Sequence, residues 1–217
     1  MGFIQNGGFV STTDQKRARE IMGKNFFGVE EAIKYFGVNP NRQQLAALSE
    51  IPFSEAVLEQ LKDTHVLVAV FPLSILDIRD KLGFSSGYDD LFCDGGGMDI
   101  WYIKESFAKE RSKVIWQLVG KTIVDKSTSK TWQEQQALIG EEEEIPTAQV
   151  MIYVMTGHYL ATDERLFENI LIRTSSMCSC GHVCVGNFNL GGHNITAYRN
   201  NFCIYFLGVS SARKVIK

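Results

Sequence analysis

Six side chains that can bind zinc lie near the C-terminal end of the sequence: Cys178, Cys180, His182, Cys184, His193 and Cys203. The first four alternate along one extended segment, where a rise of about 3.3 Å per residue spreads them over about 20 Å. Tetrahedral zinc needs sulfur ligands at about 2.3 Å, and no Cys-x-x-Cys pair is present. Only a turn at residues 179–181 could bring Cys178 and Cys184 together. We therefore expect no bound metal and no cofactor, with a small zinc-binding α+β domain as an alternative.

Motifs of catalysis give little support for an enzyme. No His-Glu-x-x-His, Walker A or Gly-x-Gly-x-x-Gly pattern occurs in the sequence. Asp94, Asp99 and His158 have side chains suited to acid–base chemistry, but nothing in their spacing brings them together. We expect a protein without enzymatic activity, and a catalytic α+β domain of unknown reaction remains an alternative.

The composition of residues 178–213 departs from that of the rest of the chain. These 36 positions contain no Lys, Glu, Gln, Met or Trp, although these five types occur 45 times in residues 1–177. They hold four of the five cysteines and five asparagines, and no carboxylate side chain follows Glu168. When both adenines of an asparagine codon that ends in a pyrimidine are randomised, fifteen residue types can arise. The five types that cannot arise are the five that are missing, which indicates adenine-directed mutagenesis.

On this composition, the C-terminal segment resembles the variable protein of a diversity-generating retroelement. The ending Gly208-Val209-Ser210-Ser211-Ala212-Arg213 is similar to the short invariant tail that follows the variable stretch in that family. The resemblance covers only residues 178–213, the candidate variable region. It implies a C-type-lectin-like fold with its variable residues at the extreme C-terminus. It also implies a ligand-binding protein that displays a diversifiable surface.

Alternation of apolar and polar residues predicts which side chains form that surface. Val183, Val185, Phe188, Ile195 and Tyr198 are expected to face a core, which turns their neighbours outward. Substitutions are tolerated on an outer face, because changes of volume in a core are costly. Tyr, Asn, Ser and Gly are also typical of adaptable binding surfaces. The predicted contact set is His182, Cys184, Asn187, Asn189, His193, Asn194, Thr196, Arg199, Asn200, Asn201, Cys203 and Tyr205, and the expected ligand is a macromolecule, a protein in the first place.

The elements that position this set are predicted from capping residues and hydrophobic spacing. Helices are expected at 12–21, 29–36, 43–49, 54–61, 74–81, 131–138 and 147–160. Continuous or alternating apolar runs predict strands at 66–71, 114–119 and 170–209, with a turn at 189–192. The predicted fold class is α+β, in which a helical N-terminal region, residues 1–64, precedes a C-type-lectin-like domain, residues 65–217.

Charge and hydropathy exclude several other classes. The 217 residues are 45% hydrophobic and 22% charged, which is ordinary globular usage and not that of a disordered chain. A net charge of −3 gives no basic footprint for nucleic acid. No apolar run reaches the roughly 18–20 residues of a membrane span, and the first residues lack the basic and apolar regions of a signal peptide. The expected location is cytoplasmic, with surface display by another route left open.

Overall fold

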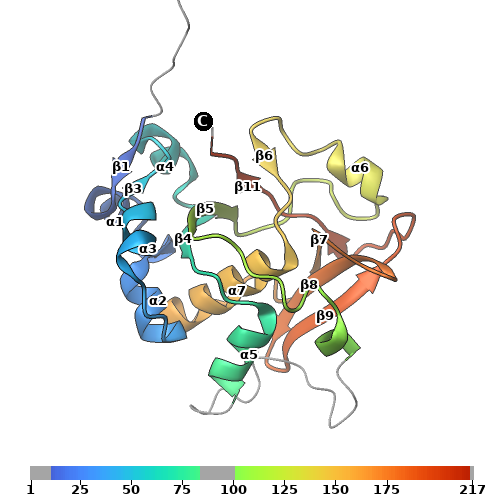
Figure 1. Ribbon diagram of the computed structural model, residues 1–217. Coiled ribbons are helices and arrows are strands. Elements are labelled where there is room, and N and C mark those ends of the chain that lie inside the picture. Colours follow the sequence, from blue (N-terminus) through green and yellow to red (C-terminus); the bar gives the residue numbers. More distant parts are fainter. Residues whose placement is uncertain (1–10, 84–100, 216–217) are drawn as a thin grey trace, which may run out of the picture.

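Helices dominate the first part of the chain. The structure is a computed structural model that describes residues 11–83 and 101–215 (Figure 1). The Asp14, Asn41 and Ser54 side chains each accept a hydrogen bond from a backbone N–H in the first turn of the helix that follows. These helices are α1 (Gln15–Met22), α2 (Val29–Phe36), α3 (Arg42–Ala47) and α4 (Glu55–Leu61), with the 3₁₀ turn η1 (Gly23–Asn25) after α1. The predicted helical N-terminal region is confirmed.

A five-stranded sheet joins the two ends of the described chain. Its order is β2 (Phe26–Phe27), β4 (His65–Val70), β5 (Ile115–Gly120), β11 (Ala212–Arg213) and β6 (Glu143–Glu144). β2 runs parallel to β4, and the other neighbours are antiparallel. The core therefore extends across residue 64, where the sequence predicts the end of the helical region. A separate pair, β1 (Thr13–Asp14) and β3 (Glu50–Ile51), lies beside α1.

The C-terminal part forms a second sheet of four strands. Its order is β10 (Leu207–Gly208), β7 (Leu171–Cys178), β8 (Gly181–Asn189) and β9 (Gly192–Tyr198). β7, β8 and β9 are antiparallel neighbours, whereas β10 pairs in parallel with β7. The predicted C-terminal antiparallel strands and the mixed α+β class are thus confirmed. The strand expected to continue to residue 209 is reduced to the two residues of β10.

One buried helix, α7 (Ala148–Thr162), runs through the middle of the molecule (Figure 1). Every residue from Ala148 to His158 is buried, as expected for a helix that is apolar around its whole circumference. It contacts β4 of the first sheet, β7 and β8 of the second, and helices α2 and α5 (Ile75–Gly83). The remaining elements are α6 (Trp132–Gln136) and the 3₁₀ turn η2 (Trp101–Lys104). Within the described ranges, no helix has both the length and the apolar character needed to cross a membrane.

Candidate functional site

The alternation predicted for β8 and β9 is present for most of the two strands. Val183, Val185 and Ile195 are buried on the α7 side of the sheet. In the antiparallel register His182 lies opposite Tyr198, Cys184 opposite Thr196, and Gly186 opposite Asn194, so these six share the other face. Tyr198 is therefore on the outer face, and the prediction that it faces the core was wrong.

The outer face is not open to solvent along its whole length. Residues 199–206 fold back over it and bring Ile204 and Phe206 onto the cluster of Leu171, Cys184 and Leu207 of β10. Helix α6 covers a second part, where the ring of Trp132 stacks on that of His182 at a centroid distance of 3.7 Å. His182 and Cys184 are consequently buried, which corrects the expectation that both point outward.

The chemistry of His182 and Cys184 fits their burial. His182 Nδ1 lies 3.0 Å from the backbone oxygen of Thr174, and burial lowers the pKa of the imidazole. Burial raises the pKa of the Cys184 thiol to about 12, and this thiol donates to the backbone oxygen of His182. Both side chains therefore act as part of the sheet's packing and are not available to a ligand.

His193 is also buried, on the opposite face of the sheet from His182. Its Nε2 lies 2.8 Å from the Thr156 hydroxyl of α7, and its ring stacks on Phe188 at 3.8 Å. Burial lowers its pKa to about 3, so the imidazole is neutral at physiological pH. The predicted contact set thus loses three members, His182, Cys184 and His193, to the interior.

The nine remaining members extend from the tip of the β8–β9 hairpin to the segment after β9. Seven of them are exposed and two, Asn187 and Thr196, are half-buried. Asn187, Asn189 and Asn194 lie at the tip of the β8–β9 hairpin. Thr196 is two residues from Asn194 on the same face of β9, and the other five members follow the end of β9 at Tyr198. We use the name loop surface for Thr196 and five of the six exposed residues of the segment after β9: Arg199, Asn200, Asn201, Cys203 and Tyr205.

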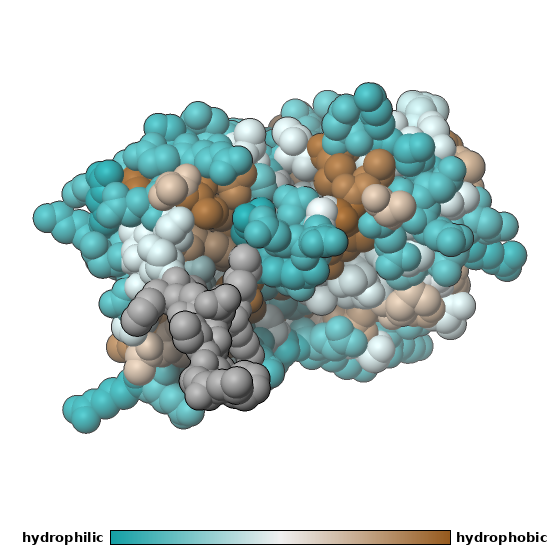
Figure 2. Space-filling view, turned by 90° about the horizontal axis from the view of Figure 1, so that it is seen from above, coloured by the Kyte–Doolittle hydropathy of each residue, from teal (hydrophilic) through white to brown (hydrophobic). Residues whose placement is uncertain are grey.

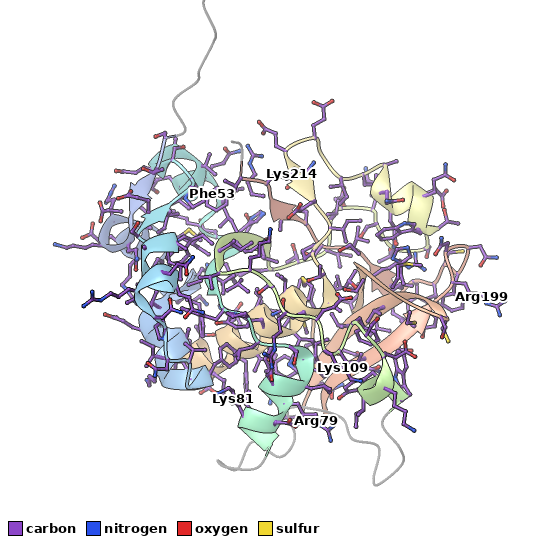
Figure 3. The ribbon with its side chains drawn as sticks, in the orientation of Figure 1. Phe53, Arg79, Lys81, Lys109, Arg199 and Lys214 are labelled. Atoms are coloured by element: carbon purple, nitrogen blue, oxygen red, sulfur yellow. The ribbon has the colours of Figure 1, made fainter. Side chains whose placement is uncertain are left out.

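The loop surface is chemically distinctive. Tyr205 is 76% exposed, and its ring meets Phe206 edge to face at 5.1 Å. Tyr198 and Phe202 stack almost in parallel, 4.3 Å apart with an interplanar angle of 6°. Arg199 projects at the outer edge of the molecule (Figure 3). Aromatic rings, amides and one guanidinium therefore share a surface to which the last 49 residues contribute no carboxylate side chain.

The main chain of residues 199–206 is held by the surrounding scaffold through its carbonyl groups. The backbone N–H of Trp132 donates to Asn200 O at 2.9 Å, and that of Ser129 to Ile204 O at 3.1 Å. The backbone N–H of Leu171 donates to Phe206 O at 2.9 Å. Every residue type offers a backbone carbonyl, so these contacts do not depend on the side chains that the segment carries.

Two glycines of β8 are fixed by close main-chain contacts. Gly181 has φ +132°, and a Cβ there would lie only 2.3 Å from the backbone oxygen of Tyr198. Gly186 has φ +133°, and its Cβ would lie 2.4 Å from the backbone oxygen of Ile170. Asn187, which follows at φ 47°, completes an irregularity where the β8–β9 register shifts. The backbone conformation at these three positions of the candidate variable region is therefore constrained by the fold.

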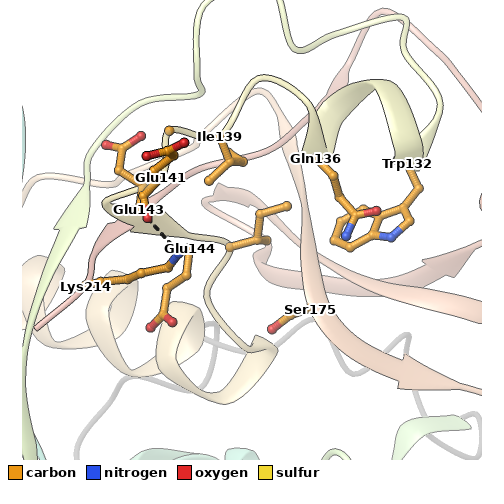
Figure 4. A pocket seen from close by; sticks show the side chains of 10 residues that line it. Trp132, Gln136, Ile139, Glu141, Glu143, Glu144, Ser175 and Lys214 are labelled. Atoms are coloured by element: carbon orange, nitrogen blue, oxygen red, sulfur yellow. Dashed lines mark hydrogen bonds between the residues drawn. The ribbon is translucent and has the colours of Figure 1, made fainter. Parts of the chain in front are cut away.

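A cavity of about 380 Å³ lies between α6 and the segment that includes β6 (Figure 4). Trp132 and Gln136 of α6 form one side, and Lys214 and three glutamates form the other, where Lys214 Nζ donates to the backbone oxygen of Glu141 at 2.8 Å. Its lining contains no histidine or cysteine. The face seen from the side of α4 and β6 is mainly hydrophilic with separate hydrophobic patches (Figure 2).

The alternatives of metal binding and catalysis gain no support from the described residues. In residues 11–83 and 101–215, no three His, Cys, Asp or Glu side chains lie close enough together to hold a metal ion. The cysteines at 178, 180, 184 and 203 are free thiols. His158 is buried with its Nε2 3.5 Å from the Glu164 carboxylate, while Asp94 and Asp99 lie outside the described residues. Residues 83–87 read Gly-Phe-Ser-Ser-Gly, the spacing of a hydrolase nucleophile motif, and all but Gly83 also lie outside them.

Sequence reasoning missed Arg173, the only charged residue of β7. It is completely buried, and its guanidinium lies between α6 and residues 199–202. A signal was present, because an arginine directly after the apolar run Ile170-Leu171-Ile172 is unusual for a half-buried strand.

Comparison of this chain with protein-family models, with curated proteins and with solved structures gave no match.

Proposed function

We propose that this protein binds a macromolecular ligand, a protein, through the loop surface, and that the side chains of this surface can be diversified without loss of the fold. One observation carries the proposal: residues 199–206 are held through main-chain carbonyls, while the side chains of the loop surface are exposed. The surface therefore combines a fixed path with free side chains. That combination is the requirement for a binding site whose specificity changes by substitution.

The composition of the surface supports a protein as the ligand. Tyrosine, asparagine and arginine are the residues that adaptable paratopes use, because aromatic rings supply contact area and amides supply hydrogen bonds. The absence of carboxylates after Glu168 leaves Arg199 as the one charged group of the loop surface. Nucleic acid is not favoured, since the whole chain carries a net charge of −3.

The five missing residue types support diversification as the origin of this surface. Lys, Glu, Gln, Met and Trp are absent throughout residues 178–213, as expected for adenine-directed mutagenesis. The resemblance to retroelement variable proteins is thereby part of the proposal. The buried positions set a limit on it, because substitutions at His182, Cys184 and His193 would disturb packing.

A selection experiment tests the proposal. The six positions of the loop surface are randomised on the full chain, the library is displayed, and it is selected for binding to egg-white lysozyme as a probe protein. We expect variants that bind with a Kd below about 10 µM, which corresponds to about 7 kcal/mol. A folded library from which no such binder emerges would contradict the proposal.

A matched control separates the loop surface from the rest of the protein. In each selected variant the six positions are returned to their original residues, which should abolish lysozyme binding. A variant that still binds after this reversion would place the contact elsewhere. A second library of equal size at His182, Val183, Cys184, Val185, His193 and Ile195 should lose the folded state, because these side chains are buried.

A further inference from the structure

Arg173 is a cation in the interior of the second sheet. Its exposed fraction is 0%, and it lies on the face of β7 that residues 199–206 cover. No ion pair joins it to a carboxylate within the described ranges of the chain. Burial of an unpaired charge is costly unless several hydrogen bonds satisfy it. Its hydrogen bonds therefore show what keeps it there.

The guanidinium joins two parts of the chain that are far apart in the sequence. Nη1 donates to Gln135 Oε1 at 2.7 Å, and Nη2 donates to the backbone oxygen of Phe202 at 2.6 Å. The backbone oxygens of Lys130 and Arg199 lie at 3.5 Å from Nη1 and Nη2. Only arginine has a planar fork of donors that can reach two sides at once.

Gln135 extends this arrangement. Its side chain is completely buried, and its Nε2 donates to the backbone oxygens of Ser127 at 2.8 Å and Leu207 at 3.2 Å. The pair Arg173–Gln135 thus bonds to the main chain within the exposed part of the loop, at Arg199 and Phe202, and after it, at Leu207. All its acceptors in residues 199–207 are backbone carbonyls.

We propose that Arg173 is the positioning residue of the loop surface: it fixes the path of residues 199–202 whichever side chains they carry. The proposal rests on the function proposed above for its biological meaning. Its physical content is independent of any ligand. A guanidinium bonded to carbonyls recognises the backbone alone, so it holds a diversified loop as it holds the present one.

Trypsin digestion can measure how firmly the loop is held, because trypsin cleaves after arginine and Arg199 is exposed. Cleavage requires local opening of the segment, so its rate reports how firmly the loop is held. The folded Arg173→Met and Arg173→Lys variants are treated with trypsin under native conditions, and the products are assigned by mass spectrometry. We expect cleavage after Arg199 to become at least tenfold faster in both variants. Methionine has neither the charge nor the hydrogen-bond donors, and lysine keeps the charge but lacks the planar fork of donors.

Tyr153→Phe is the matched control. It removes another buried hydrogen bond, from the Tyr153 hydroxyl to Ala69 O at 3.1 Å, in the core around α7 and away from the loop. If the Arg173 variants are cleaved after Arg199 no faster than this control, the proposal is wrong. Should Arg173→Met fail to fold, Arg173→Lys decides the comparison.

A chain with Asn200, Asn201 and Tyr205 replaced by serine and Arg173 retained provides the converse test. It should remain as protected after Arg199 as the unchanged protein. Loss of protection in this chain would show that the loop is held by its own side chains, which overturns the proposal. Neither measurement involves a ligand, so failure here leaves the binding proposal to be judged by the lysozyme selection.

Discussion

Replacement of Gly186 by alanine tests whether the candidate variable region contains positions that the fold keeps fixed. Gly186 lies in β8 with φ +133°, a conformation that residues with a Cβ rarely adopt. The new Cβ would lie 2.4 Å from the backbone oxygen of Ile170 and 3.3 Å from the Cα of Leu171. An ordinary contact of this kind is about 3.5 Å, so β7 and β8 must move apart by about 1 Å.

The size of the effect follows from these two features. A strained backbone conformation of this kind costs about 1–3 kcal/mol. Separation of two paired strands in a packed sheet adds to it, and the total expected loss in the free energy of unfolding is about 3–5 kcal/mol. For a chain of this length that corresponds to a fall in Tm of about 6–20 °C.

Asn194→Ala is the control, because Asn194 lies directly opposite Gly186 in the register and is exposed. Thermal unfolding followed by circular dichroism compares the two variants with the unchanged protein. Asn194→Ala should alter stability by no more than about 0.5 kcal/mol. The reasoning is refuted if Gly186→Ala melts within about 2 °C of the unchanged protein, the range expected for such a surface change.

Three further predictions concern the cysteine thiols, the buried His193 and the gene. In the native protein at pH 8, a thiol reagent should modify Cys180 and Cys203, which are exposed, and leave Cys184 unmodified; peptide mass mapping checks this, and early labelling of Cys184 would contradict its burial. Burial lowers the pKa of His193 to about 3, from about 6.5 in the unfolded chain, so the unfolded state binds the extra proton and stability should fall as the pH drops from about 6.5 toward 3. Urea unfolding between pH 7 and 5, above most carboxylate titration, should show this slope and show it reduced in His193→Phe; an unchanged slope would refute the assignment. Sequencing of the locus should find a near-copy of the segment encoding residues 178–213 beside a reverse transcriptase gene, and its absence would remove the retroelement interpretation.

Local signals in the sequence predicted the helices well. Helix α2 ends before Gly37, which has the left-handed conformation that its sequence position suggests, and Ser54 caps α4 as expected. The buried strand β4 was predicted from a continuous apolar run. In each of these elements, the residues that determine the structure lie within the element or beside it.

The exposure of the outer face was not predictable in the same way. Period-two alternation specifies which side chains share a face, but it does not say what covers that face. Residues 204–209 predicted a strand, but only Leu207 and Gly208 form one, β10, whereas Ile204 and Phe206 pack against the cluster of Leu171, Cys184 and Leu207. Their hydrophobicity indicated burial correctly, and the error concerned the partner, which is a long-range contact.

Two other features depend on geometry that alternation does not include. The irregularity at Gly186 and Asn187 shifts the register of β8 against β9, so alternation cannot be followed across it. The role of Arg173 depends on Gln135 and Phe202, which are 38 and 29 residues away along the chain. The sequence could flag an arginine in an apolar strand, but it could not identify these partners.

The most direct test of the central claim is the stability of one combined variant, in which Asn194, Arg199, Asn201 and Tyr205 are all replaced by alanine. If these exposed side chains serve binding and the backbone holds the loop, each replacement changes the free energy of unfolding by at most about 0.5 kcal/mol. The sum is then at most about 2 kcal/mol, and Tm should fall by no more than about 8 °C with the circular dichroism spectrum unchanged. A fall of more than about 10 °C would show that these side chains hold the fold, and it would contradict the account of a freely variable binding surface.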